Sequence, residues 1–199
     1  MYLVKNRKLN RWLGFDYDTP GWYFVTICIK DKRQCLGNVL GGKMVLNNFG
    51  EIALKYWRQI SEHYNNIELD EFQIMPNHVH GIIFINKRKS IGAHNVGTGS
   101  VVGAGDDHKI LTVGTDQCSV PTLRAPTTHY GLLSKMIKSF KEATVKNIKR
   151  EYNFSFQWQR SFYDHVIRGE KDYNYIKYYI QQNPAKWAED KNNPINLKK

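Results

Sequence analysis

The sequence predicts an α+β fold of the ferredoxin-like kind, in which helices cover an antiparallel sheet. Short segments rich in alternating apolar and β-branched residues recur along the chain, and segments with helical spacing separate them. In chain order the expected elements are β-β-β-α-β-β-α-β-α. The length of 199 residues suits one ordinary domain and is short for two. We therefore expect a single domain over residues 1–199, with one long flexible insertion.

Six strands are expected from their composition. The segment GWYFVTICIK alternates apolar with polar residues, NVLGGKMVL contains a Gly-Gly turn, and a Pro-Asn turn separates IELDEFQIM from HVHGIIFI. These segments predict a first strand, a hairpin and a pair of joined strands, at 21–30, 38–46, 67–75 and 78–85. The segment 154–168 predicts a further strand followed by an irregular turn.

Three segments have the apolar spacing of amphipathic helices, at 47–64, 131–152 and 170–187. Asn47 or Asn48 is suited to cap the first of them. Pro184 lacks an amide hydrogen and should end the last helix near Asn183.

The composition changes over residues 87–128, which are rich in Gly, Ser, Thr and Val and show no periodicity. A glycine-rich phosphate loop is disfavoured because no Lys-Ser/Thr pair follows and no strand-to-helix context frames the glycines. We expect this segment to be an inserted flexible loop.

The net charge of +11 is the most informative feature of the composition. It indicates attraction to phosphate backbones, although a merely soluble basic surface would have the same charge. No apolar run approaches the ~18–20 residues that cross a bilayer. The basic N-terminus contains no apolar signal region, and the three cysteines form no CxxC. A cytoplasmic protein with reduced thiols is expected.

Basic residues cluster near the N-terminus and in the segment 129–160. Aromatic residues make up 13% of the chain, and basic residues interleaved with aromatics suit a groove that binds an unpaired strand. The candidates for contacts with a nucleic-acid backbone are Arg11, Lys135, Lys138, Lys146, Lys149 and Arg160.

Two histidines, His78 and His80, lie one residue apart in the apolar segment FQIMPNHVHGIIFI. Residues i and i+2 of a strand point to the same face, so these imidazoles should lie side by side. Such a pair can hold one divalent metal ion, although two histidines on a half-solvated surface remain an alternative. A metal site needs further ligands from elsewhere in the chain.

The last predicted helix places Tyr175, Tyr179 and Asn183 on one side, with Ile176 and Ile180 on a neighbouring stripe. A phenol beside a metal-bound phosphate is a suitable nucleophile. Amphipathic packing with hydroxyl groups at the rim explains the same pattern. Spacing alone does not choose Tyr179 over the neighbouring tyrosines.

Three blocks, MPNHVHGII, WQRSFYDHVIR and YIQQNPAKW, closely resemble the single-tyrosine HUH transposases of the REP-associated type. GWYFVTI and KSFKEATVK are also similar to that family, and the resemblance extends over about residues 10–188 outside the insertion. The insertion is longer than in compact members of the family. Asp164 and His165 match the family pattern, and we expect them to give structural support or to contact DNA.

The resemblance implies a metal-dependent transposase or nickase for single-stranded DNA. It implies that His78 and His80 hold Mg²⁺ or Mn²⁺, that Asn183 assists them, and that Tyr179 is the nucleophile. Cleavage and rejoining would then pass through a 5′-phosphotyrosine link, at sites flanked by a DNA hairpin. The family further implies a homodimer that acts on DNA in the cytoplasm, associated with the nucleoid.

Two other functions stay open. One is a nucleic-acid-binding regulator on the same scaffold that cleaves nothing. The other is a metal hydrolase that uses bound water, for which Asp70 or Glu71 would supply the base. The intact set of His78, His80, Tyr179 and Asn183 argues against the regulator.

Overall fold

The computed structural model describes residues 19–87 and 131–198, all of which belong to one structural unit. The expected insertion at 87–128, apart from its first residue, and Arg11 lie outside the described residues. No helix in the described ranges is both long and apolar enough to cross a bilayer.

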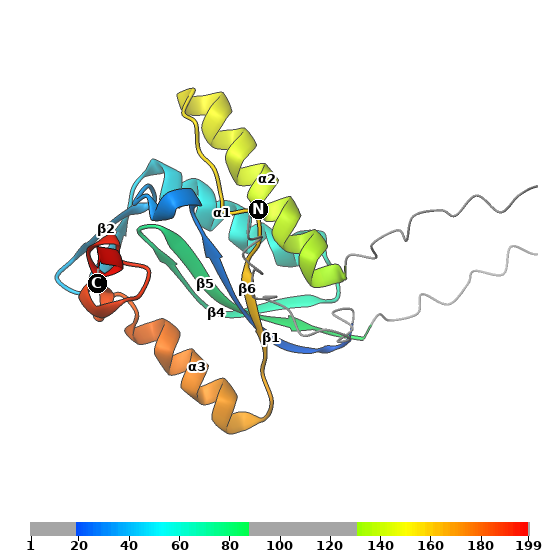
Figure 1. Ribbon diagram of the computed structural model, residues 1–199. Helices are drawn as coiled ribbons and strands as arrows, with labels where there is room; N and C mark the ends of the chain where they lie inside the picture. The colour runs from blue at the N-terminus through cyan, green and yellow to red at the C-terminus, as the bar shows by residue number, and fades with distance from the viewer. Residues whose placement is uncertain (1–18, 88–130, 199) are drawn as a thin grey trace, which may run out of the picture. The chain divides into compact units, whose positions relative to one another are not determined.

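An antiparallel sheet of four strands forms the centre of this unit, in the order β4-β5-β1-β6 (Figure 1). Helices α1 and α2 connect its strands in the pattern β-α-β-β-α-β, and a separate hairpin of β2 and β3 precedes α1. The predicted ferredoxin-like α+β fold is therefore confirmed. The strands are β1 Gly21–Cys28, β2 Gly37–Leu40, β3 Lys43–Leu46, β4 Ile67–Met75, β5 His78–Ile85 and β6 Tyr163–Val166. The α-helices are α1 Asn48–His63, α2 Leu132–Tyr152 and α3 Glu170–Gln182.

Helices α1 and α2 cover one face of the sheet (Figure 1). Val25 and Ile27 of β1 and Val79 and Ile83 of β5 are fully buried beneath them, because alternate residues of a strand share a face. Trp57 of α1 lies so close to β5 that a β-carbon at position 81 would meet its ring at 2.2 Å. Only glycine fits there, which explains the glycine inside an otherwise apolar strand.

Helix α3 covers the other face, on which it packs against β4 and β5. Ile176 and Ile180 are its buried residues, and they form a second apolar cluster with Phe24 of β1 and Ile82 of β5. His78 and His80 of β5 share this face with Ile82, as does Phe84. Burial of this small cluster therefore brings α3 over the histidine pair.

The helix boundaries expected from capping are confirmed. Asn47 caps α1, since its side chain accepts hydrogen bonds from the backbone N–H groups of Phe49 and Gly50. Helix α3 ends at Gln182 with Asn183 as its C-cap, directly before Pro184.

The strand expected at the start of 154–168 is wrong. The chain after α2 is irregular up to Phe162, apart from one bridge between Ile29 and Trp158, and the strand β6 begins only at Tyr163. The alternation that suggested a strand has another cause, because Phe156 and Trp158 both point into the core beneath α2. Two carbonyls of this stretch, of Gln159 and Ser161, accept hydrogen bonds from the ammonium of Lys141 rather than from a neighbouring strand.

Candidate metal and nucleophile site

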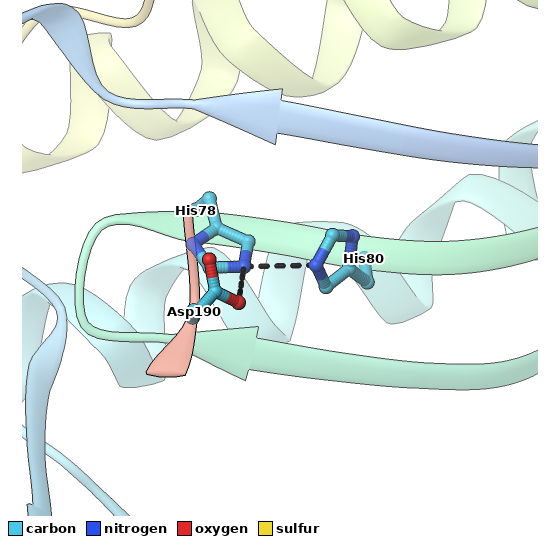
Figure 2. A group of neighbouring side chains, drawn as sticks. All are labelled: His78, His80 and Asp190. Atoms are coloured by element: carbon cyan, nitrogen blue, oxygen red, sulfur yellow. Dashed lines mark hydrogen bonds and ion pairs between the residues drawn. The ribbon is translucent and has the colours of Figure 1, made fainter. Parts of the chain in front are cut away.

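His78 and His80 lie side by side on β5, and both are buried, with 0% and 1% of their surface exposed. Their Nε2 atoms are 2.9 Å apart. Figure 2 shows the two rings beside one another on the same strand. The second nitrogen of each ring also has a partner: Nδ1 of His78 lies 2.8 Å from the side-chain oxygen of Asn77, and Nδ1 of His80 lies 2.9 Å from the hydroxyl of Thr26. Both rings are thus held so that Nε2 faces the same point.

A carboxylate from the C-terminal segment completes the group. Oδ2 of Asp190 lies 3.9 Å from Nε2 of His78, and Figure 2 shows Asp190 beside the histidine strand although it comes from a distant part of the chain. The ligand atoms of the three residues all lie within 4.8 Å of one another. Asp190 is also buried, with 9% of its surface exposed, and a buried carboxylate is stable only with a partner.

Both imidazoles are neutral at physiological pH. Burial lowers the pKa of His78 to about 4, although the Asp190 carboxylate beside it acts in the opposite direction. Burial lowers the pKa of His80 well below its ordinary value, and the neighbouring His78 adds to this effect. Neutral imidazoles present a free lone pair, which is the form that binds a metal.

The spacing of the group fits a divalent metal ion. Two ligands at right angles and about 2.1 Å from one ion lie about 3 Å apart, close to the separation of the two Nε2 atoms. Asn183 could supply a further ligand atom, because its Oδ1 is buried and has no hydrogen-bond partner among the described residues. Asn183 lines the same cavity as His80 and Asp190. Two imidazole nitrogens with carboxylate and amide oxygens suit several divalent ions.

Tyr179 of α3 reaches this group with its hydroxyl. Its oxygen lies 3.4 Å from Nε2 of His80, and its ring packs edge-on against Phe24 with centroids 6.2 Å apart. Burial raises the pKa of Tyr179, as does Asp190, while a hydrogen bond from the side chain of Asn183 lowers it. The phenol is therefore protonated at neutral pH and lies at the edge of the cluster.

The other tyrosines of α3 occupy different positions. Tyr175 and Tyr178 are 71% and 57% exposed, and Tyr173 donates a hydrogen bond to Asp70 of β4. Only Tyr179 among the tyrosines of this helix lies within hydrogen-bonding reach of the histidine pair in the described structure. Tyr179 is therefore the tyrosine of this helix that lies beside the histidine pair, and its role as nucleophile stays a prediction.

An open cavity of about 540 Å³ lies over the group and leads to solvent. His80, Tyr179, Asn183 and Asp190 line it at the cluster, and Tyr163 and Tyr175 line it farther out. Lys186 and Lys191 also line the cavity, so two ammonium groups lie in the same cavity as the side chains that could hold a metal ion. Such a cavity can admit an anionic group.

The basic residues expected to contact a nucleic acid lie elsewhere. Helix α2 covers the opposite face of the sheet, so its lysines are not brought to the histidine pair. All of the described candidates are exposed: Lys135, Lys138, Lys146, Lys149 and Arg160. Their contact with a nucleic acid stays a prediction, whereas Lys186 and Lys191 are the basic residues at the cavity itself.

His165 lies in the cavity wall, paired with Asp172 at the start of α3. Its Nε2 is 2.9 Å from Oδ2 of Asp172, which also accepts a hydrogen bond from the backbone of Arg168. Although burial raises the pKa of Asp172, these two hydrogen bonds lower it on balance. The pair ties the end of β6 to α3, which is one of the two roles expected of His165, and its contact with DNA stays a prediction.

The two carboxylates considered as the base of a hydrolase are engaged elsewhere. Asp70 accepts hydrogen bonds from Tyr173 and Lys177, and Glu71 accepts one from Gln181. All three partners belong to α3, so both carboxylates fasten that helix to β4. Neither belongs to the group of His78, His80 and Asp190 that could hold a metal ion.

Sequence reasoning missed Asp190 and missed Asn77, whose side-chain oxygen lies beside Nδ1 of His78. Asp190 follows α3 by eight positions, in the mixed segment WAEDKNNP, and neither spacing nor apolar context distinguishes it from Glu189. Asn77 directly precedes the first histidine and is fully buried, which is unusual for asparagine in a turn. Burial is a property of the fold and left no signal in the sequence.

Comparison with known proteins supports the fold assignment. The chain is 29% identical over 192 residues to an uncharacterized protein of Haemophilus influenzae, covering 94% of this chain and 93% of the relative. A solved structure of a REP-associated tyrosine transposase bound to a REP hairpin matches with a TM-score of 0.53 and 17% identity, covering 92% of this chain and 77% of the other. No profile of a known protein family matches the chain. The chain thus has a fold like that of a tyrosine transposase.

Proposed function

We propose that the protein is a metal-dependent transposase or nickase of single-stranded DNA, which cleaves and rejoins the strand through a 5′-phosphotyrosine intermediate. The observation that carries this proposal is the position of the Tyr179 hydroxyl, 3.4 Å from Nε2 of His80 and at the edge of the group formed with His78 and Asp190. A nucleophile beside a metal-ligating group suits phosphoryl transfer. The motifs of the HUH transposases and the likeness of the fold support the same function.

His78, His80 and Asp190 would hold Mg²⁺ or Mn²⁺, with Asn183 as a further ligand. When bound, the ion would neutralise the negative charge of the scissile phosphate. It would also neutralise the charge that develops on the phosphate oxygens during the reaction. The remaining contributions come from the chain itself. Packing of Ile176 and Ile180 on the sheet holds the Tyr179 oxygen in place, and a fixed nucleophile lowers the entropic cost of the reaction.

In the proposed step the Tyr179 oxygen bonds to the phosphorus of the strand, and the bond from phosphorus to the 3′ oxygen breaks. The phenol proton is released to water, and the 3′ oxygen takes up a proton to become a 3′-hydroxyl. The 5′ end then stays linked to Tyr179. A 3′-hydroxyl of a second strand reverses the step, so that the phosphotyrosine bond is exchanged for a phosphodiester without any external energy source.

The cavity beside the cluster would receive the strand. Lys186 and Lys191 would contact its phosphates, and the exposed rings of Tyr163 and Tyr175 offer surfaces on which unpaired bases can stack. A DNA hairpin near the cleavage position and a homodimer as the active form are further parts of this proposal. The exposed basic residues of α2 and Arg160 would contact DNA away from the cleavage position.

The test uses labelled single-stranded DNA with a hairpin, taken from palindromes that flank the gene, incubated with the protein and Mn²⁺. We expect a covalent protein–DNA adduct on a denaturing gel, and no adduct with Tyr179→Phe. The matched control Tyr178→Phe removes an exposed hydroxyl from the next position of the same helix and should form the adduct as the unchanged protein does.

Two outcomes would contradict the proposal. Cleavage without an adduct would indicate a hydrolase that uses bound water. Tight binding of the hairpin without cleavage, with Mn²⁺ bound to the protein, would indicate a regulator that only binds nucleic acid.

A further inference from the structure

Asn77 lies in the turn between β4 and β5, directly before His78, and its backbone is fixed independently of the site. Its carbonyl accepts a hydrogen bond from the N–H of Ile29 at 2.8 Å, and the carbonyl of Pro76 accepts two, from Cys35 and Leu36. The Asn77 side chain is fully buried. A buried amide is tolerated only where its donors and acceptor are satisfied.

The hydrogen bonds of this side chain fix the orientation of its amide. Its Nδ2 donates to the carbonyl of Lys32 at 2.9 Å and to the carbonyl of Asn192 at 2.8 Å. A carbonyl accepts only, so the nitrogen must face this pair, and the reversed amide would place an oxygen against two oxygens. The side-chain oxygen of Asn77 therefore faces Nδ1 of His78.

This orientation determines which nitrogen of His78 bears the proton. An amide oxygen accepts only, so Nδ1 of His78 must carry the hydrogen that forms the 2.8 Å contact. The neutral ring has one N–H, which leaves Nε2 with a free lone pair. That lone pair faces Nε2 of His80 and the Asp190 carboxylate (Figure 2).

The same amide also holds the segment that carries the third group. Its donor Nδ2 binds the carbonyl of Asn192, and the backbone N–H of Asn192 in turn donates to Oδ1 of Asp190 at 2.5 Å. With Oδ1 engaged, Oδ2 of Asp190 is the oxygen that faces His78, at 3.9 Å from Nε2. Asn77 thus reaches two members of the metal-ligating group by separate routes.

We propose that Asn77 is a positioning residue of the metal site: its side-chain oxygen holds His78 in the tautomer that leaves Nε2 free, and its side-chain nitrogen holds the Asn192 turn that presents Asp190. This inference rests on the proposed metal site and extends it to a residue that touches neither metal nor DNA. Partners that orient a ligating histidine affect metal affinity by about 10- to 100-fold when they are removed.

The experiment reads the tautomer directly in the metal-free, full-length protein. Long-range ¹H–¹⁵N NMR of protein with labelled histidines distinguishes a protonated ring nitrogen from one with a free lone pair, and His78→Gln assigns the signals of His78. In the unchanged protein we expect Nδ1 of His78 to be protonated and Nε2 to be free. In Asn77→Ala we expect this preference to be lost, with Mn²⁺ affinity about 10- to 100-fold weaker by calorimetry.

Two further variants test the two roles of Asn77 separately and show whether a general loss of structure explains the result. Asn77→Asp keeps an acceptor for Nδ1 of His78 but removes both donors, so the tautomer should be retained. The N–H of Asn193, which binds the carbonyl of Asp190, should then exchange faster with solvent, and Mn²⁺ should bind more weakly. The control Asn196→Ala removes side-chain contacts to the carbonyls of Ala188 and Asp190, without touching His78, and should leave its tautomer unchanged.

The inference is overturned if folded Asn77→Ala keeps the Nδ1 proton of His78 and the Mn²⁺ affinity of the unchanged protein. It is also overturned if Asn77→Asp loses the tautomer, because the oxygen would then not be its determinant. Failure of the proposed function has a different signature, since an unchanged protein that neither binds Mn²⁺ nor forms a DNA adduct would contradict that function. The tautomer measurement in the absence of metal still decides whether Asn77 orients His78.

Discussion

The hydroxyl oxygen of Tyr179 lies 3.4 Å from Nε2 of His80, although 99 residues separate the two in the chain. A central strand supplies the imidazole, and a helix that follows the last strand of the sheet supplies the phenol. The apolar contacts of Ile176 and Ile180 with Phe24 and Ile82 bring the two together. A small core thus determines the geometry on which the proposed chemistry depends.

Replacement of Asp190 by asparagine should weaken metal binding. Asp190→Asn keeps the size of the side chain and its acceptor for the Asn192 N–H, but removes the charge that faces His78. We expect Mn²⁺ affinity to fall by about tenfold or more, with a matching fall in adduct formation at low Mn²⁺. Calorimetric titration of the metal-free protein measures the affinity.

The control for this prediction is Glu189→Gln, which removes a neighbouring carboxylate that is exposed and outside the metal-ligating group. Its Mn²⁺ affinity should stay close to that of the unchanged protein. Equal losses in both variants would mean that only the general negative charge of the cavity matters, and Asp190 would not be a ligand.

Much of the fold was predictable because its signals are local. The strand alternation, the N-cap of Asn47 and the helix end at Pro184 each depend on neighbours within a few positions, and the structure confirms them. The pairing of His78 with His80 has the same local origin, since residues two apart on a strand share a face. The irregular stretch before β6 was missed because burial of Phe156 and Trp158 produces the same period as a strand.

The contribution of the C-terminal segment was not predictable from local pattern. Asp190 meets His78 only because the chain after Pro184 turns back to the sheet, where backbone carbonyls of Lys191 and Asn192 accept hydrogen bonds from Lys32 and Asn77. Such contacts depend on tertiary packing and have no periodicity. The resemblance to a transposase family indicated the histidines, Tyr179 and Asn183 but offered no counterpart for Asp190.

Loosening the attachment of α3 to β4 should slow adduct formation. Tyr173 donates a hydrogen bond to Asp70, which lies in an irregular part of β4 and also pairs with Lys177 at 3.2 Å. Tyr173→Phe removes this hydrogen bond from the helix that carries Tyr179. We expect a loss of about 1 kcal/mol or less in the free energy of unfolding and slower single-turnover adduct formation.

Urea denaturation and a single-turnover assay measure these two effects. Tyr178→Phe is the matched control, because this hydroxyl is on the same helix, is exposed and lies outside the cavity lining. A Tyr173→Phe protein that forms the adduct at the unchanged rate would show that this hydrogen bond does not help to position Tyr179.

The exposed rings at the outer part of the cavity should contribute to DNA binding. Tyr163 and Tyr175 are 50% and 71% exposed and line the cavity together with Tyr179. Stacking of an unpaired base on an aromatic side chain is worth about 1–3 kcal/mol, so Tyr163→Leu or Tyr175→Leu should raise the Kd for single-stranded DNA by about 5- to 150-fold. Fluorescence anisotropy in a nicking-deficient Tyr179→Phe background measures the Kd.

For this prediction Tyr178→Leu is the control, since it removes an equally exposed ring that lies outside the cavity lining. Its Kd should stay within about twofold of the background value. Losses of equal size in all three variants would indicate that exposed aromatics bind DNA non-specifically and that the cavity has no special part in it.

Lys141 should make the stability of the fold rise with pH in the alkaline range. Burial lowers the pKa of Lys141 to about 8, against 10.5 for the ordinary side chain, while its Nζ donates to the carbonyls of Gln159 and Ser161. A neutral amine keeps two N–H groups, so deprotonation relieves the buried charge and retains both hydrogen bonds. Between these two pKa values the unfolded chain binds the proton and the folded chain does not. The stabilisation from this shift is therefore fully present above about pH 10.5 and is lost as the pH falls through about 8.

Urea denaturation of the unchanged protein and of Lys141→Met at several pH values measures this stabilisation. The difference between their free energies of unfolding should grow in favour of the unchanged protein as the pH rises. Lys135→Met, which removes an exposed ammonium from the same helix, should show no such trend. A difference that stays constant from pH 7 to 10 would mean that the Lys141 ammonium is as well solvated in the folded protein as in the unfolded chain.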